Sequence, residues 1–353
     1  MRFLLDPEQR ALAHSLNRLL TAADTPAVIR AWARGDRAPG RALWSRLADA
    51  GVCALAIPEE YEGVGPLPVE LAVAFVELGR HGVPGPLVET VAAAALLTEL
   101  GEPGHGKSGL GESDPAKRLL PALASGEALA TVALPGGGPF VLDAEAADLH
   151  LAVRDIGTHP ELQLTTGATG APGQEQSTPR PSLDPARHLA LPRPGGELLA
   201  SGPQLTRAAT QALIWARLAT AAQALGVGLA LLDRTVAYVK QRTQFGVPIG
   251  SFQAVKHQLA DAKIALEFAR PLLFGAALSM APADVAAAKV TAGEAAYATA
   301  RTALQLHGAI GYTAEYDLSL WLTKARALRT AWGSPAECRA EVLGALSGGD
   351  PRS

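Results

Sequence analysis

Hydrophobic positions recur with a helical period near the start of the chain. Leu12, Leu16 and Leu19 fall on one face of a helix. This helix begins after Asp6, because Asp is a favourable N-cap residue and Pro7 suits the first helical position. Similar patterns predict further helices over residues 40–50, 71–79 and 87–100.

The pattern changes between residues 128 and 202, where short apolar runs lie between clusters of Gly and Pro. Such runs are typical of β-strands. Strands are predicted over residues 130–134, 140–142, 149–153, 161–165, 189–191 and 198–199. We therefore expect a small β domain here, with a polar loop over residues 167–180.

A helical pattern returns after residue 204. Leu259, Leu266 and Leu273 are spaced by seven residues within one predicted helix. Helices are expected over residues 205–241, 251–273, 283–306, 315–329 and 335–346. Long antiparallel helices joined by short turns form a bundle. The predicted fold is mostly α with a small β domain: an N-terminal helical domain (1–127), a shortened middle β domain (128–202) and a C-terminal four-helix bundle (203–353).

Composition narrows the functional class. Of the 353 residues, 48% are hydrophobic and 18% are charged, which supports a large core and excludes a disordered chain. The net charge of −3 gives no basic balance that would indicate nucleic acid as a partner. Cys53 and Cys338 are the only cysteines, which argues against a disulfide scaffold or a cysteine-based metal site and favours the cytoplasm. No apolar run indicates a membrane span or a signal peptide.

One motif is misleading. Residues 101–108, GEPGHGKS, fit the phosphate-loop pattern of nucleotide hydrolases. That loop works only between a buried strand and a helix, whereas an Ala-rich helical pattern precedes it here. We therefore expect a surface loop.

Two turns in the bundle carry candidate chemistry. Arg242 lies on the turn that joins two long helices, and its guanidinium group matches the oxygens of a phosphate. A turn of this kind, taken alone, is usually only a connection. A second glycine-bearing turn, over residues 305–312, strengthens the functional interpretation.

Three segments together resemble the acyl-CoA dehydrogenase family. They are RTQFGVPIGSFQAVKHQLAD (242–261), QLHGAIGYTAEYDL (305–318) and IPEEYEGVG (57–65). The resemblance implies a FAD-dependent enzyme that oxidises an acyl-CoA substrate between its α and β carbons, as in fatty acid or sterol side-chain oxidation. It further implies a homo- or hetero-oligomer, dimer or tetramer, with another acyl-CoA dehydrogenase subunit, and an electron-transfer flavoprotein or similar acceptor.

The resemblance also assigns roles to residues. The positions implied to bind FAD are Arg242, Thr243, Gln244, Phe252, Gln253, Gln305, His307, Gly308, Ala309 and Ser334. Those implied to lie beside the substrate are Arg217 and Gly333. We interpret His257 as a packing or capping residue.

The chain departs from the family at the catalytic base. The family places a Glu at one of two positions, which here hold Trp332 and Ala216, and neither side chain accepts a proton. The family's hydroxyl-bearing flavin loop reads ALPGGGP here, over residues 133–139. Three interpretations stay open: an active enzyme with a displaced base (Glu59, Glu60 or Glu315), a non-catalytic subunit of a hetero-oligomer, and a scaffold without cofactor.

Overall fold

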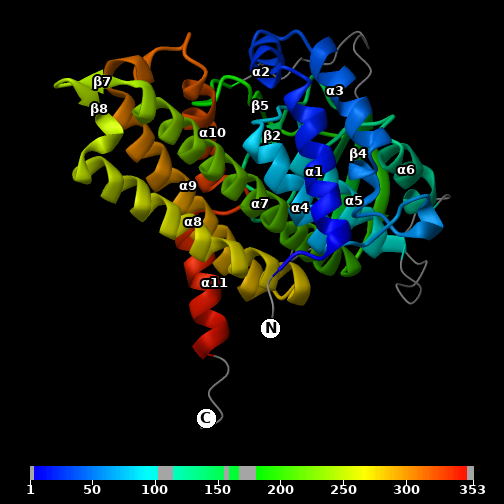
Figure 1. Cartoon of the computed structure of the whole chain (residues 1–353). Helices are drawn as coiled ribbons and strands as arrows, with labels where there is room; N and C mark the ends of the chain where they lie inside the picture. The colour runs from blue at the N-terminus through cyan, green and yellow to red at the C-terminus, as the bar shows by residue number, and fades with distance from the viewer. Residues whose placement is uncertain (1–3, 102–113, 155–158, 167–179, 348–353) are drawn as a thin grey trace. The chain divides into compact units, whose positions relative to one another are not determined.

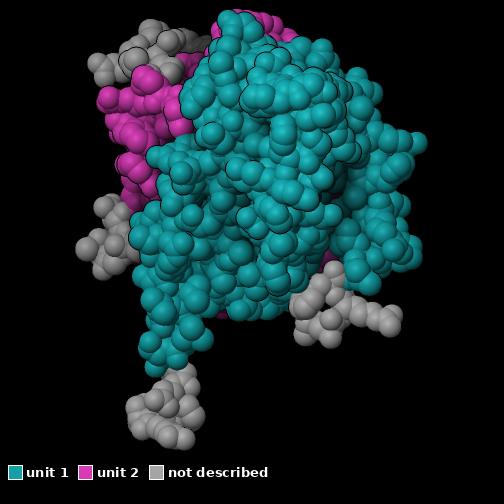
Figure 2. Space-filling model, turned by 60° about the vertical axis from the view of Figure 1, so that its left-hand side comes forward, with its two compact units in different colours: residues 1–29, 72–83, 220–353 teal, residues 30–71, 84–219 magenta. Residues whose placement is uncertain are grey.

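A computed structural model of the chain describes residues 4–101, 114–154, 159–166 and 180–347 (Figure 1). The chain forms two compact units. One comprises residues 1–29, 72–83 and 220–353, and the other comprises residues 30–71 and 84–219 (Figure 2). We name them the bundle unit and the sheet unit.

The sheet unit combines helices with a small sheet. Its central helix, α5, is buried on nearly every side and packs against α6 and β1. A helix that is apolar all round belongs in a core. The helical elements of this unit are α3 (Ala38–Asp49), η1 (Val52–Ala54), η2 (Glu59–Tyr61), α5 (Leu87–Gly101) and α6 (Pro115–Ala124).

The main sheet has the strand order β1-β3-β4-β6. β1 and β3 are parallel, while the β3–β4 and β4–β6 pairs are antiparallel, and β2 pairs separately with β5. The strands are β1 (Ala130–Ala133), β2 (Val141–Leu142), β3 (Leu149–Arg154), β4 (Glu161–Thr166), β5 (Leu189–Ala190) and β6 (Glu197–Ser201).

A buried carboxylate ties the β segment to a helix. Asp143 is fully buried and accepts hydrogen bonds from Trp32 Nε1 at 3.1 Å and from the His188 backbone N–H at 3.3 Å. Arg41 donates to both carboxylate oxygens of Asp148 at 2.9 Å. The buried contacts of Asp143 and the half-buried Arg41–Asp148 ion pair favour one docking geometry for these segments.

The bundle unit is built around long helices. α9 packs against α8, α10 and α11. Asp6 and Gln9 form the capping box that begins α1. The elements are α1 (Pro7–Thr21), β7 (Thr243–Gln244), β8 (Val247–Pro248), η3 (Ile249–Ser251), α8 (Gln253–Ser279), α9 (Pro282–His307), η4 (Gly308–Tyr312), α10 (Leu318–Thr330) and α11 (Pro335–Ser347). Three helices contribute to both units: α2 (Thr25–Ala33), α4 (Pro68–Arg80) and α7 (Gln204–Gln241).

Two glycines let α4 and α7 cross with their backbones in contact. A Cβ atom added to Gly226 would lie 1.9 Å from the carbonyl oxygen of Val76, and one added to Gly79 would lie 2.1 Å from that of Gln223. Neither position therefore has room for a side chain.

The predicted fold class is confirmed, and every predicted strand is present. The sequence did not predict α2 or α6 as separate helices, nor the β7–β8 hairpin. By length and composition, α7 is the one described helix that qualifies as a membrane span; 89% of its apolar window is buried, as in the core helix of a soluble protein. The phosphate-loop pattern and most of the predicted polar loop lie outside the described residues. The helix α5 ends at Gly101, so a helix rather than a strand precedes that pattern.

Replacing Gly226 with Ala should destabilise the protein by about 1–3 kcal/mol, because the new methyl group must push two helix backbones apart. Urea unfolding of the purified chain measures this. Gly344→Ala in α11 is the matched control, since nothing lies within 4 Å of its Cβ position. It should be neutral or stabilise by up to about 1 kcal/mol. Equal stabilities for the two variants would contradict the close helix crossing.

Candidate cofactor-binding site

The end of α7 leads into a short hairpin that carries the predicted arginine. The Arg242 N–H donates to the Tyr238 carbonyl at 2.9 Å, which closes the last helical turn. The Ile249 N–H donates back to the Arg242 carbonyl at 2.8 Å, across the β7–β8 pair. The tip of the hairpin consists of Phe245 and Gly246, both in the left-handed region with φ of 53° and 80°. This local bonding holds the hairpin in a defined conformation.

The hairpin presents its side chains outward. Arg242, Thr243 and Gln244 are exposed, and the Arg242 guanidinium has no ion-pair partner among the described residues. Phe245 is 91% exposed. A bulky residue with positive φ is strained, and an exposed aromatic ring is unfavourable in water. Strain and exposure together indicate a binding surface.

The helix α8 follows the hairpin and the short helix η3, and it begins without a side-chain cap. Phe252 occupies its N-cap position and has no side-chain acceptor, and no acidic residue lies in the first turn. The first N–H groups of a helix of 27 residues therefore carry a partial positive charge that no side chain neutralises. Gln253 adds an exposed amide at the first helical position.

A ring stack joins the second predicted turn to the first. The rings of Tyr238 and His307 stack with centroids 4.1 Å apart and planes at 22°. Tyr238 Oη also donates to the His307 carbonyl at 3.4 Å. Because Tyr238 lies one turn before Arg242, the structure brings the two turns to the same end of the bundle unit. Gln305, Gly308 and Ala309 are exposed there.

His307 itself is buried rather than open to a ligand. It is 4% exposed, and Nδ1 donates to the Ala303 carbonyl at 2.8 Å. Its Nε2 atom is then the acceptor nitrogen, and it has no hydrogen-bond partner among the described residues. Burial lowers the pKa of His307 below its usual value. His307 therefore serves as a stacking element beneath the turn.

Ser334 and Gly333 lie at the opposite end of α9. Ser334 caps α11, because the Glu337 N–H lies 3.3 Å from Ser334 Oγ and the Ser334 N–H donates to Glu337 Oε2 at 2.7 Å. The buried Lys289 donates to the carbonyls of Leu328 at 3.0 Å and Gly333 at 3.5 Å. Lys289 precedes His307 by 18 residues on the same helix, or about 27 Å.

The structure therefore does not bring Ser334 to the Arg242 hairpin within one chain. Sequence reasoning also missed Lys289, which fixes the turn that contains Trp332 and Gly333. The signal that could have found it is a lone Lys in the Ala-rich run that forms α9. A cation buried among alanines requires carbonyl or carboxylate partners.

Both positions implied for the base are buried and carry no carboxylate. Trp332 is 6% exposed in the bundle unit, and its backbone φ is 58°. Ala216 has no exposed surface and Arg217 is 6% exposed, both in the sheet unit. His257, interpreted as a packing or capping residue, is exposed on α8, and no side chain makes a capping hydrogen bond at the start of that helix.

The exposed groups of the hairpin end fit a diphosphate. They comprise an unpaired guanidinium, a hydroxyl, several amides and an uncapped helix N-terminus. Cations, N–H donors and helix N-termini are the groups that bind phosphate oxygens. A Cβ atom added to Gly308 or Gly246 would meet nothing within 4 Å, so the backbone there is open to a ligand. We name this surface the cradle: Arg242, Thr243, Gln244, Phe252, Gln253, Gln305, Gly308 and Ala309.

Comparison with known proteins matches nearly the whole chain. Two family models match: "Acyl-CoA dehydrogenase, N-terminal domain" over residues 6–127 and "Acyl-CoA dehydrogenase, C-terminal domain" over residues 206–343. The acyl-CoA dehydrogenase IpdE2 of Mycobacterium tuberculosis is 32% identical over 334 residues, which cover 94% of this chain and 95% of that protein.

Solved structures agree with these matches. A variant of the Tcur3481-Tcur3483 steroid ACAD superposes with a TM-score of 0.82 at 28% identity, covering 97% of this chain and 98% of that one. A chain of the ChsE4-ChsE5 complex from Mycobacterium tuberculosis superposes with a TM-score of 0.81 at 26% identity, covering 99% of this chain and 100% of that one.

The lowered pKa of His307 predicts weaker folding in acid. The unfolded chain binds the proton first, so the free energy of unfolding falls as the pH drops below about 6.5. His307→Phe keeps a ring against Tyr238 and removes this titration. Its urea midpoint should therefore fall less than that of the wild type between about pH 7.5 and about pH 5. An identical loss in both proteins would show that His307 makes no contribution.

Proposed function

Because the chain belongs to the acyl-CoA dehydrogenase family, we propose that it takes part in the FAD-dependent α,β-dehydrogenation of an acyl-CoA thioester. In this proposal, the chain is the subunit that supplies the cofactor cradle, and it does not supply the catalytic base. One observation carries this proposal. The polar groups of the cradle are retained and exposed, while Trp332 and Ala216 replace the carboxylate at both base positions.

The cradle would hold the diphosphate side of FAD. The Arg242 guanidinium and the uncapped start of α8 would bind phosphate oxygens, and the amides of Gln244 and Gln305 would donate to the adjoining sugar and phosphate groups. The bound flavin supplies a hydride acceptor for the reaction. The residues of this chain hold and orient the cofactor.

A partner subunit would cover the cradle. Phe245, Ile310 and Tyr312 expose apolar surface around it, at 91%, 42% and 76% exposure. Buried in a subunit interface, these three side chains would exclude water from the cofactor. Two of the related structures are named as pairs of proteins, ChsE4-ChsE5 and Tcur3481-Tcur3483. We therefore favour a hetero-oligomer in which a second acyl-CoA dehydrogenase chain carries the Glu.

The proposal extends to the surroundings of the reaction. An electron-transfer flavoprotein or similar acceptor would reoxidise the flavin, and the assembly would work in the cytoplasm. Fatty acyl and steroid side-chain thioesters are both candidate substrates, the latter because one relative is named a steroid ACAD. The competing version, an active chain with a displaced base, needs Glu59, Glu60 or Glu315 to act, and all three are exposed.

Arg242→Gln should lower the affinity of the assembly for FAD about ten- to hundredfold, because a charge-assisted bond to phosphate is lost. The flavin content of the purified assembly and its loss on dialysis measure this. Lys240→Gln is the matched control, since Lys240 is an exposed cation in the last turn of α7. It should retain flavin. If the wild type holds no flavin, either alone or with any co-purified chain, the flavoprotein proposal fails.

If the partner supplies the base, mutations at the base positions of the two chains should have unequal effects on turnover. Replacing the partner's catalytic Glu with Gln should slow turnover about 10²–10⁴-fold. Trp332→Phe in this chain should leave turnover within about twofold, since no proton passes through this position. A panel of fatty acyl and steroid side-chain CoA thioesters, assayed with an artificial electron acceptor, gives the rates. Full activity after loss of the partner's Glu would contradict the proposed division.

A further inference from the structure

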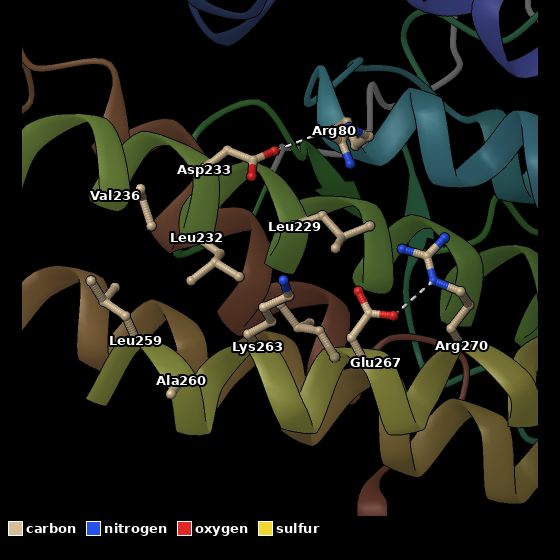
Figure 3. Close-up of a pocket in the computed structure, with 11 residues that line it drawn as sticks. Arg80, Leu229, Leu232, Asp233, Val236, Leu259, Ala260, Lys263, Glu267 and Arg270 are labelled. Atoms are coloured by element: carbon tan, nitrogen blue, oxygen red, sulfur yellow. Dashed lines mark hydrogen bonds and ion pairs between the residues drawn. The ribbon is translucent and has the colours of Figure 1, made fainter. Parts of the chain in front are cut away.

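A groove of about 580 Å³ lies between α7 and α8 in the bundle unit (Figure 3). Its floor is aliphatic. The floor residues are Leu229, Leu232 and Val236 from α7 and Leu259 and Leu266 from α8. Lys263, which lines the groove, lies ten residues, or about 15 Å, beyond the start of α8. None of the residues that line the groove belongs to the cradle.

The rim of the groove is charged, and most of its charges are paired. Arg80 Nη2 lies 2.7 Å from Asp233 Oδ2, and Arg270 Nε lies 3.6 Å from Glu267 Oε2. The remaining cation is Lys263. Its side chain rises from α8 towards α7 (Figure 3), and its ammonium makes no hydrogen bond or ion pair with a described residue.

These features specify a ligand with one negative charge and an aliphatic body. The volume lies within the range of small-molecule sites. The half-buried Val236 and Leu259 offer the groove's accessible apolar surface, and buried leucines lie beneath it, so a hydrocarbon chain can pack there. The unpaired ammonium of Lys263 beside this surface matches a single carboxylate. We propose that the groove binds a free fatty carboxylate, with its chain along the leucines and its carboxylate on Lys263. This proposal does not depend on flavin binding.

A second protein chain is a less suitable occupant, because α8 offers it another face. Ile264, Phe268 and Leu272 are exposed and spaced by four residues, so they form a continuous apolar ridge. With 3.6 residues per turn, this ridge is rotated by about 100–180° from Lys263 around the helix axis. A partner helix would gain more apolar contact on the ridge than in the groove.

Calorimetric titration of the purified full-length chain tests the proposal, with dodecanoate and dodecan-1-ol as a pair of ligands that differ in charge. We expect one dodecanoate to bind per chain, and dodecan-1-ol to bind about tenfold more weakly. Lys263→Met should weaken dodecanoate binding about tenfold and leave the alcohol unaffected. Lys256→Met, two turns earlier on the same helix, should change neither affinity.

Three outcomes would overturn the proposal. They are the absence of saturable dodecanoate binding, equal affinity for the two ligands, and equal effects of Lys263→Met and Lys256→Met. Sedimentation of the same samples adds a further check. If Lys263→Met changes the oligomeric mass and leaves dodecanoate binding unaltered, the groove is a protein interface instead. None of these readouts uses flavin content or turnover, so failure here is distinguishable from failure of the proposed enzyme function.

Discussion

The direct backbone contact between α4 and α7 is the constraint on which the bundle unit depends. Because Gly79 and Gly226 carry no side chains, the two helices cross at a separation that any larger residue would prevent. The crossing places Arg80 beside α7, where it pairs with Asp233. The indole N–H of Trp321 then donates to the Arg80 carbonyl at 2.9 Å, which ties α10 to the same junction.

The position of α7 in turn determines where its last residues lie. The Tyr238 ring stacks on His307, and the arginine hairpin follows within one turn. A stack of two rings, together with the hydrogen bond from Tyr238 to the His307 carbonyl, therefore aligns two turns that are more than 60 residues apart in sequence. The rigid helices hold the turns, and the turns present polar groups. A site built in this way can bind an extended anionic cofactor without a deep pocket in the chain itself.

The two ends of α9 have different roles. His307 supports the cradle at one end. At the other, Lys289 fixes the turn where the family carries its base, and this chain has Trp332 there. Hydrogen bonds from Lys289 hold this turn in place, although the Trp332 side chain cannot accept or donate the α-proton. This separation is consistent with our proposal that the chain binds the cofactor while a partner supplies the base.

Sequence periodicity predicted most of the helices and the strands, because periodicity is local. The residues of the cradle were predicted from their resemblance to family motifs. Local sequence patterns could not predict the tertiary contacts. The stack of Tyr238 on His307 and the backbone contact at Gly226 join residues that are far apart in the chain. The exposure of Phe245 depends on a left-handed turn that the residue type itself disfavours. The base positions were judged from residue identity alone, and Ala216 and Trp332 carry no carboxylate in any conformation.

The most direct test of this division is anaerobic bleaching of the flavin by acyl-CoA, compared between the FAD-reconstituted chain alone and its assembly with a co-purified partner. Loss of the visible flavin absorbance reports hydride transfer, which requires that a base remove the α-proton. Our account predicts that the assembly bleaches and that the chain alone does not. Rapid bleaching by the chain alone would show that it carries its own base, and would contradict the account.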